Sequence, residues 1–257
     1  MTVRKMMVSF ALMGMIGSAS AKEDNPRFDI ILLIGQSNMA GQGKVEPQDR
    51  RAIPGVFKLT SNAQWAPAKD PLGSDDPREF GVGPGRSFAR SLLKARPDAR
   101  IGLVSAAVGN TNLQQWAPGG RLYNRAFLLL RQAQRTGRLR AILWHQGESD
   151  ANNPRRAKSY AARWVAMMKQ LRTDADAEHV PIIVGELGEY LDKPYASEIN
   201  RQIESLPQKL DNVAVVSSKG LTERGDGLHF DSKSQRELGR RYAKAFMALD
   251  HSWVQEQ

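Results

Sequence analysis

The sequence contains no cysteine among its 257 residues. A disulfide framework and a cysteine nucleophile are therefore both excluded, and the fold must be stabilised by packing. Histidine is also scarce, with four residues in the chain, so the search for a catalytic base is short. Beyond the first residues, no stretch is apolar for long enough to span a membrane as a helix. The sequence shows no internal repeat, no low-complexity tract and no linker between domains.

The first residues have the plan of a secretory signal. A basic start at Arg4 and Lys5 is followed by a short apolar segment and then by Ala-Ser-Ala, ending at Ala21. The alternative, an uncleaved anchor, is disfavoured because the chain turns polar directly after Ala21. We expect a signal peptide over 1–21 and a secreted or periplasmic protein. The remainder, 22–257, has about 235 residues and fits a single α/β domain.

The charge balance is basic, with a formal net charge of +10 and a pI near 10.0. Loss of the signal would leave about +8. The arginines are dispersed among helical segments rather than gathered with aromatic residues, so the composition does not favour a nucleic acid as partner. A solvated basic surface is the simpler interpretation, and attraction to anionic polymers of the cell envelope is the alternative.

Short apolar runs alternate with helical patterns along the chain. The expected strands are 29–34, 100–108, 141–145, 181–185 and 213–217. The expected helices are 85–95, 122–136, 154–172, 195–206 and 232–249. Because the strands are almost continuously apolar, they fit a parallel sheet that is covered on both faces. We therefore predict a doubly wound α/β fold, a three-layer α/β/α sandwich with a parallel five-stranded sheet.

The stretch 41–83 differs from the rest, since it is rich in Pro, Gly, Asp and Asn. A connection of this length in a compact domain is usually a functional loop or a lid. Within it, "GVFKLT" is a further strand candidate.

Polar, glycine-containing sequences follow four of the expected strands. They are "GQSNMAG" at 35–41, "AAVGNTNLQQW" at 106–116, "WHQGESD" at 144–150 and "GDGLHFD" at 225–231. Because ligands of such folds bind at the carboxyl ends of the parallel strands, we expect these four sequences to meet in space.

Ser37 is the candidate nucleophile, on a corner between a strand and a helix. A hydroxyl needs a neighbouring base for this role, and the alternative for Ser37 is a helix N-cap. Of the four histidines, His179 and His251 lie in polar surface segments, and His145 ends a buried strand, where a structural role is the simpler interpretation. His229 remains as the candidate base.

Asp226 precedes His229 by three residues on a glycine-rich turn. From there its carboxylate can accept the Nδ1–H of His229 and leave Nε2 directed at the serine. Glu148 is a second carboxylate in the third segment. It is a rival partner for His229, an acceptor behind the site, or a brace for the Ser37 loop.

An oxyanion would need hydrogen-bond donors near Ser37. The candidates are the backbone N–H groups of Ser37 and Gly109 and the side-chain amide of Gln146, with ordinary turn residues as the alternative for the last two. Other polar and aromatic residues of the same segments are candidates for contact with substrate: Gln36, Asn38, Asn110 and Trp116. Trp116 and Trp65 could stack on a sugar ring or pack in the core.

Together, "IGQSNMAGQG", "WHQGESDA" and "DGLHFD" resemble the sialate O-acetylesterase and acetylxylan esterase group, which is carbohydrate esterase family 6 and its relatives within the SGNH hydrolases. The resemblance implies a flavodoxin-like fold and hydrolysis of O-acetyl esters on carbohydrates, without a metal or other cofactor. It assigns the nucleophile to Ser37, the base to His229 and the acid to Asp226, with Glu148 as the family's other candidate acid. SGNH enzymes use an asparagine as side-chain oxyanion donor in their third block, where Gln146 is the substitute here.

The expected partner is an acetylated carbohydrate, of the acetylxylan or sialate type. Two alternatives remain: a catalytically silent carbohydrate-binding protein, and a lipase or thioesterase that acts on longer acyl chains. The identity of the sugar and the oligomeric state stay open.

Overall fold

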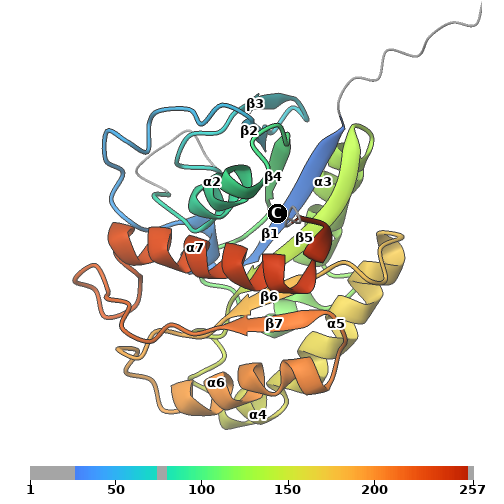
Figure 1. Ribbon diagram of the computed structural model, residues 1–257. Helices are drawn as coiled ribbons and strands as arrows, with labels where there is room; N and C mark the ends of the chain where they lie inside the picture. The colour runs from blue at the N-terminus through green and yellow to red at the C-terminus, as the bar shows by residue number, and fades with distance from the viewer. Residues whose placement is uncertain (1–26, 74–79, 254–257) are drawn as a thin grey trace, which may run out of the picture.

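Seven strands form one sheet in the order β3-β2-β4-β1-β5-β6-β7 (Figure 1). The computed structural model describes residues 27–73 and 80–253, so the expected signal peptide lies outside the described residues. The strands are β1 (Phe28–Gly35), β2 (Val56–Leu59), β3 (Trp65–Pro67), β4 (Ile101–Ser105), β5 (Gly137–His145), β6 (Ile182–Gly185) and β7 (Val213–Val216). All pairings are parallel except that between β2 and β3. The three-layer α/β architecture is confirmed, whereas the number of five strands was wrong.

The two additional strands lie at one edge of the sheet. β2 is part of the "GVFKLT" candidate, and it pairs in parallel with β4. β3 is only three residues long, which is too short to give a pattern in the sequence. Both strands lie within 41–83, so this stretch adds two short strands to the sheet instead of forming only an open loop.

Helices cover both faces of the sheet. On one face lie the short α1 (Ser37–Ala40), α2 (Gly85–Ala95) and α7 (Ser232–Leu249). On the other lie the 3₁₀ turn η1 (Leu113–Trp116), α3 (Arg121–Gln134), α4 (Pro154–Lys158), α5 (Tyr160–Asp174) and α6 (Ala196–Glu204). The 3₁₀ turns η2 (Leu206–Gln208) and η3 (His251–Trp253) complete the assignment.

The central strand β1 shows why its sequence is continuously apolar. Ile30, Leu32 and Ile34 are buried in the core on the α3–α6 face. Ile31 and Leu33, which point the other way, are buried in the core beneath α2 and α7. Alternate side chains of a strand face opposite sides of the sheet, so a strand covered on both sides has no polar face.

The predicted helix 154–172 is broken at Ser159. This residue has φ −95° and ψ 6°, ends α4 and precedes α5. Its hydroxyl donates to the carbonyl of Arg155 at 2.8 Å. A serine that bonds back to the preceding turn competes with the regular helix ladder, which explains the interruption.

Buried charges fasten the 41–73 stretch to the helices on its face. Arg86 of α2 contacts Asp70 at 3.2 Å and Asp49 at 3.8 Å. Arg236 of α7 binds Asp49 at 2.6 Å. Burial raises the pKa of Asp70 to about 7, against the opposing effect of Arg86. This part of the stretch is therefore anchored on the protein.

Within the described part of the chain, no helix is both long enough and apolar enough to cross a membrane. The carboxyl ends of the parallel strands lie on one side of the molecule; the arrows of β6 and β7 point to this side, at the left of Figure 1.

Candidate active site

Gly35 makes the turn that carries Ser37 out of the sheet. It has φ +128°, and a Cβ atom at this position would lie 2.1 Å from the carbonyl oxygen of His145 on β5. The next residue, Gln36, donates its backbone N–H to that same carbonyl at 2.9 Å. Only glycine allows β1 and β5 to stay this close while the chain turns into α1.

Ser37, His229 and Asp226 form a continuous hydrogen-bonded chain. Ser37 Oγ lies 2.9 Å from His229 Nε2, and His229 Nδ1 lies 2.7 Å from Asp226 Oδ2. The structure thus brings together two segments 192 residues apart in the sequence. Because the carboxylate accepts the Nδ1–H, the Nε2 lone pair faces the serine hydroxyl, which is the arrangement of a nucleophile and its base.

Asp226 also holds the turn on which His229 lies. Its Oδ1 accepts the backbone N–H groups of Leu228 at 2.9 Å and His229 at 2.8 Å, and Oδ2 accepts Arg224 Nε at 2.7 Å. Partial burial acts to raise the pKa of Asp226, but these bonds and that from the His229 ring outweigh it and hold the pKa below its ordinary value. Asp226 therefore remains ionised and fixes both the position and the tautomer of His229.

Asn38 is buried and joins the loop that carries Ser37 to the loop that carries His229 by hydrogen bonds. Its Nδ2 donates to Glu148 Oε1 at 2.7 Å and to the Leu228 carbonyl at 3.3 Å. Its Oδ1 accepts the backbone N–H of Phe230 at 3.1 Å. Asn38 is 1% exposed, binds protein groups through both ends of its amide and does not line the cleft, so the structure does not place it as a ligand of the substrate.

Glu148 braces the serine loop and makes no bond to His229. Its Oε1 is taken by Asn38, and Oε1 lies 3.8 Å from His145 Nε2. Burial raises the pKa of Glu148, with the bond from Asn38 opposing the shift. Of the roles considered for Glu148, the geometry favours that of holding the Ser37 loop in place through Asn38. The carboxylate that contacts His229 is that of Asp226.

His145 is a buried structural residue, as the sequence suggested. Its Nδ1 lies 3.2 Å from the Tyr242 hydroxyl, which itself donates to the Trp144 carbonyl at 2.9 Å. Because the Tyr242 hydroxyl donates its proton to this carbonyl, it can only accept from His145, so the proton of the His145 ring is on Nδ1. Burial lowers the pKa of His145 to about 3 and keeps the ring neutral.

Gln146 does not face the site, so its prediction as the oxyanion donor does not fit the structure. It is completely buried, and its Nε2 donates to Asp150 Oδ2 at 2.7 Å and to the Thr111 carbonyl at 3.0 Å. Both amide protons are therefore in use.

Gln36 offers the side-chain amide that Gln146 does not. Its Oε1 accepts the backbone N–H of Ser149 at 3.3 Å, and Gln146 Nε2, whose two protons point to closer acceptors, lies at the same distance from it. A backbone N–H can only donate, so the oxygen of Gln36 must point to Ser149. The Nε2 group then has no acceptor among the described residues, and Gln36 lines the cleft beside Ser37.

The cleft around Ser37 has a volume of about 310 Å³. Its lining includes the predicted Gly109 and Asn110, and residues that the sequence did not single out. The latter are Gln42, Ser149, Lys193 and Leu228. Gln42, Ser149 and Leu228 stand within the quoted sequences beside the candidate catalytic residues, but their side-chain types do not distinguish them, and Lys193 lies outside these sequences.

Gly109 lies directly beside the serine, where a Cβ atom would be 3.6 Å from Ser37 Cβ. Ser37 is the first residue of α1, so its N–H has no partner within the helix. Neither this N–H nor that of Gly109 has an acceptor among the described residues. Asn110 is exposed and has φ +56°.

The two tryptophans considered for sugar stacking are occupied elsewhere. Trp116 is 1% exposed, and its Nε1 donates to Thr111 Oγ1 at 3.0 Å. Trp65 stacks on Phe28 with ring centroids 4.5 Å apart. The structure therefore does not place Trp116 where it would contact a substrate at Ser37, and neither tryptophan lines the cleft.

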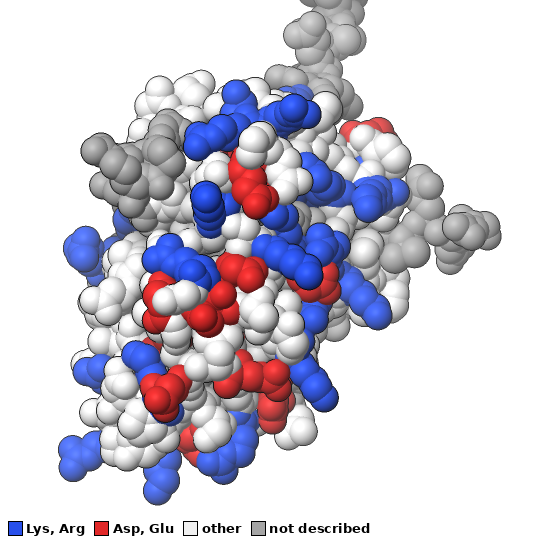
Figure 2. All heavy atoms as spheres, turned by 90° about the vertical axis from the view of Figure 1, so that its left-hand side faces the viewer, with Lys and Arg blue, Asp and Glu red and all other residues white. Residues whose placement is uncertain are grey.

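Charges of both signs surround the cleft. Figure 2 shows the side of the molecule to which the strands point, where Lys and Arg alternate with Asp and Glu instead of forming a field of one sign. Within the cleft, Lys193 is the cation of the lining and has no carboxylate partner among the described residues.

Comparison with known families decides the class of this site. The family described as carbohydrate esterase, sialic acid-specific acetylesterase, matches residues 27–248. The chain belongs to this family. It is accordingly a carboxylic ester hydrolase of the carbohydrate esterase type, and the resemblance seen in the sequence is confirmed.

Individual relatives of this carbohydrate esterase agree. A probable carbohydrate esterase of Arabidopsis thaliana, At4g34215, is 31% identical over 261 residues, which is 90% of this chain and 98% of the relative. The crystal structure of that protein matches with a TM-score of 0.80 over 87% of this chain and 99% of its own.

Two further structures share the fold at lower identity. NanS is 18% identical with a TM-score of 0.74, over 88% of this chain and 98% of its own. XAC1771, a carbohydrate acetylesterase from Xanthomonas citri, is 22% identical with a TM-score of 0.66, over 87% of this chain and 57% of its own.

Proposed function

We propose that this carbohydrate esterase removes O-acetyl groups by acyl transfer through Ser37. The observation that carries the proposal is the chain from Ser37 Oγ through His229 to Asp226, with contacts of 2.9 Å and 2.7 Å. In the first step Ser37 Oγ attacks the acetyl carbonyl while His229 Nε2 takes its proton. His229 then gives the proton to the sugar oxygen, which leaves as the alcohol.

The oxyanion of each tetrahedral intermediate needs donors that are in place beforehand. The N–H groups of Ser37 and Gly109 and the Nε2 of Gln36 supply them in this proposal, because all three lie at the cleft without a competing acceptor in the described chain. In the second step His229 Nε2 takes a proton from a water that attacks the acetyl-serine, and it then gives this proton to Ser37 Oγ as the bond from Oγ to the acetyl group breaks. The net reaction converts the ester and water into the alcohol, acetate and a proton.

Substitution of Ser37 by alanine tests the mechanism. With p-nitrophenyl acetate as substrate, we expect kcat to fall by roughly three orders of magnitude or more, because the nucleophile is lost while the donors remain. Circular dichroism and the melting temperature control for folding. Activity of Ser37→Ala within tenfold of the wild type would refute the role of Ser37.

The substrate class needs a separate experiment. The small cleft, with polar Gln36, Gln42 and Asn110 at its walls, supports a short acyl group on a sugar over a long acyl chain. We expect p-nitrophenyl esters to lose activity steeply beyond the acetyl or propionyl chain, and acetylated xylan or O-acetylated sialic acid to release acetate. A preference for long chains would favour the lipase alternative, and no release from any ester would favour a silent binding protein.

Export of the protein remains part of the proposal, supported by the sequence over 1–21. Fractionation of the producing cells and N-terminal sequencing test it; a chain retained in the cytoplasm with its first residues intact would contradict it.

A further inference from the structure

Helix α3 and the start of β5 carry an unusual excess of positive charge. The segment 121–140 contains six arginines and neither aspartate nor glutamate. Arg121, Arg125 and Arg131 are exposed on α3, Arg135 is exposed at its C-cap, and Arg138 follows with 65% of its side chain exposed. We call these five residues the α3 ridge. In Figure 1 α3 lies on the side of the sheet away from α7.

Carboxylates compensate little of this charge. Arg121 and Arg135 form no ion pair with any described residue, and Arg125 donates to the carbonyl of Ala106 at 3.0 Å. Arg131 lies 3.3 Å from Asp176, but both side chains are largely exposed. Arg138 lies 3.6 Å from Asp29. An exposed ion pair such as that of Arg131 with Asp176 is weak and leaves the cation available to another partner, and Asp29 is shared by Arg138 and Arg140.

The arrangement is unfavourable for the helix itself. Arg121 and Arg125, like Arg131 and Arg135, are four residues apart and repel each other on one face of α3. Arg121 is the first residue of the helix, where the helix dipole disfavours a cation, and the first turn contains no acidic residue. Helix stability therefore does not explain the ridge.

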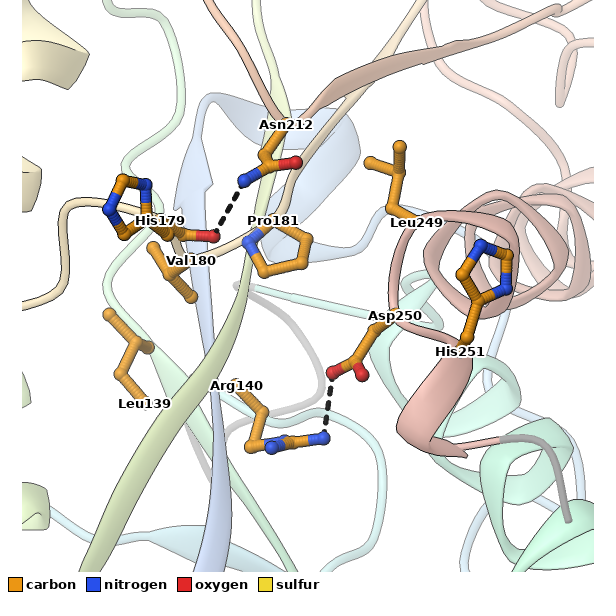
Figure 3. Close-up of a pocket in the computed structure, with 9 residues that line it drawn as sticks. All are labelled: Leu139, Arg140, His179, Val180, Pro181, Asn212, Leu249, Asp250 and His251. Atoms are coloured by element: carbon orange, nitrogen blue, oxygen red, sulfur yellow. Dashed lines mark hydrogen bonds and ion pairs between the residues drawn. The ribbon is translucent and has the colours of Figure 1, made fainter.

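The ridge ends in a hollow at the amino ends of the strands. Arg131, Arg135 and Arg138 line this hollow, which has a volume of about 470 Å³. A second hollow of about 300 Å³ shares Leu139 with it (Figure 3). There Arg140 points to Asp250 at 2.7 Å, so its charge is already satisfied. The available cations thus lie on the α3 side.

We propose that the α3 ridge binds a carboxylated polysaccharide chain at a surface separate from the catalytic cleft. From Arg121 to Arg135 the helix rises by about 21 Å, so its cations are spread along a line instead of converging on one compact anion. An extended chain with carboxylates at regular intervals complements such a line, and its binding would relieve the repulsion between the arginines. The choice of a polysaccharide rests on the proposed function, since the family acts on carbohydrates.

Other occupants fit the ridge less well. Single-stranded nucleic acid is bound with aromatic rings for stacking, but Tyr123 of α3 is buried and its hydroxyl donates to Asp174. A membrane would require several apolar side chains, and Leu128 is the single exposed large hydrophobic residue in the described chain. A second copy of the ridge would carry the same charge.

The experiment measures binding of the full chain to polygalacturonate, by affinity electrophoresis and by calorimetry, with dextran as the neutral polymer. The test variant carries Arg121→Gln, Arg131→Gln and Arg135→Gln. The control carries Arg90→Gln, Lys94→Gln and Lys244→Gln, three exposed cations of α2 and α7 without ion pairs to described residues. Both variants change the net charge by the same amount.

We expect the α3 variant to bind polygalacturonate about tenfold more weakly and the control variant to stay within twofold of the wild type. Neither variant should change the hydrolysis of p-nitrophenyl acetate, and Ser37→Ala should bind as the wild type does, so that failure of the ridge and failure of the catalytic proposal are distinguishable. Equal weakening in both variants, absence of binding to polygalacturonate, or preferred binding to anionic vesicles or single-stranded DNA would each overturn the proposal.

Discussion

Replacement of Asp226 by asparagine is the sharpest test of which carboxylate orients the base. In the structure Oδ1 of Asp226 accepts two backbone N–H groups, from Leu228 and His229. We expect the single oxygen of an asparagine to stay with these donors, because two fixed backbone N–H groups would otherwise lose their acceptor, whereas the exposed Arg224 side chain, which donates to Oδ2, can turn to solvent. Its NH₂ group then faces His229 Nδ1 at the position where Oδ2 now lies 2.7 Å away.

This exchange reverses the tautomer of His229. Nδ1 would have to accept the hydrogen bond from the amide, so the proton would move to Nε2 and face Ser37, where a lone pair is needed. We expect kcat for p-nitrophenyl acetate to fall by about 10³ to 10⁴, which corresponds to about 4 to 5.5 kcal/mol of transition-state stabilisation. KM should change little, since Asp226 does not touch the substrate.

Glu148→Gln is the matched control for Asp226→Asn. A glutamine retains an oxygen that can accept Asn38 Nδ2, now 2.7 Å from Glu148 Oε1, and it leaves His229 untouched. We expect a loss of less than about tenfold in kcat. If Glu148→Gln reduced kcat as much as Asp226→Asn, or if Asp226→Asn kept more than a tenth of the wild-type kcat, the reasoning would be refuted.

Three further outcomes are expected. Asn38→Asp would place two carboxyl groups 2.7 Å apart and lower kcat at least about tenfold. Adding Glu148→Gln would exchange donor and acceptor in this hydrogen bond and recover most of the loss in the same assay. No recovery would contradict the role of this hydrogen bond. Gln36→Ala should lower kcat about a hundredfold if its Nε2 serves the oxyanion, and an unchanged kcat would exclude that role. Burial lowers the pKa of His145 from 6.5 to about 3, so its neutral form stabilises the fold fully above pH 6.5 and this contribution is lost as the pH falls from 6.5 toward 3. Between pH 7 and pH 4.5 the free energy of unfolding of the wild type should therefore fall by up to about 2 to 3 kcal/mol more than that of His145→Gln. Urea denaturation at both pH values measures the two decreases, and equal decreases would contradict the burial argument.

The sequence was sufficient for the architecture and for the chemical class. Strands buried on both faces must be apolar throughout, and helices between them must be amphipathic, so the α/β pattern is visible without coordinates. The short edge strand β3 was missed because three residues carry no period, and the break at Ser159 was missed because it depends on one local hydrogen bond.

The assignment of roles within the site depended on tertiary structure. Ser37, His229 and Asp226 could be named in advance because nucleophile, base and orienting acid each require a particular side chain. Whether Gln36 or Gln146 presents its amide to the cleft follows from the direction of each side chain, which is set by partners such as Ser149 and Asp150.

The same holds for burial and for the choice of carboxylate. Asn38 looks like a ligand of the substrate in the sequence, yet in the fold all its capacity is used to join the serine and histidine loops. Asp226 and Glu148 are chemically equivalent as candidates, and only the packing of two distant loops places one at His229 and the other behind Asn38. Sequence determined which functional groups are available, and tertiary structure decided which of them face the cleft, because hydrogen bonding is directional and short-ranged.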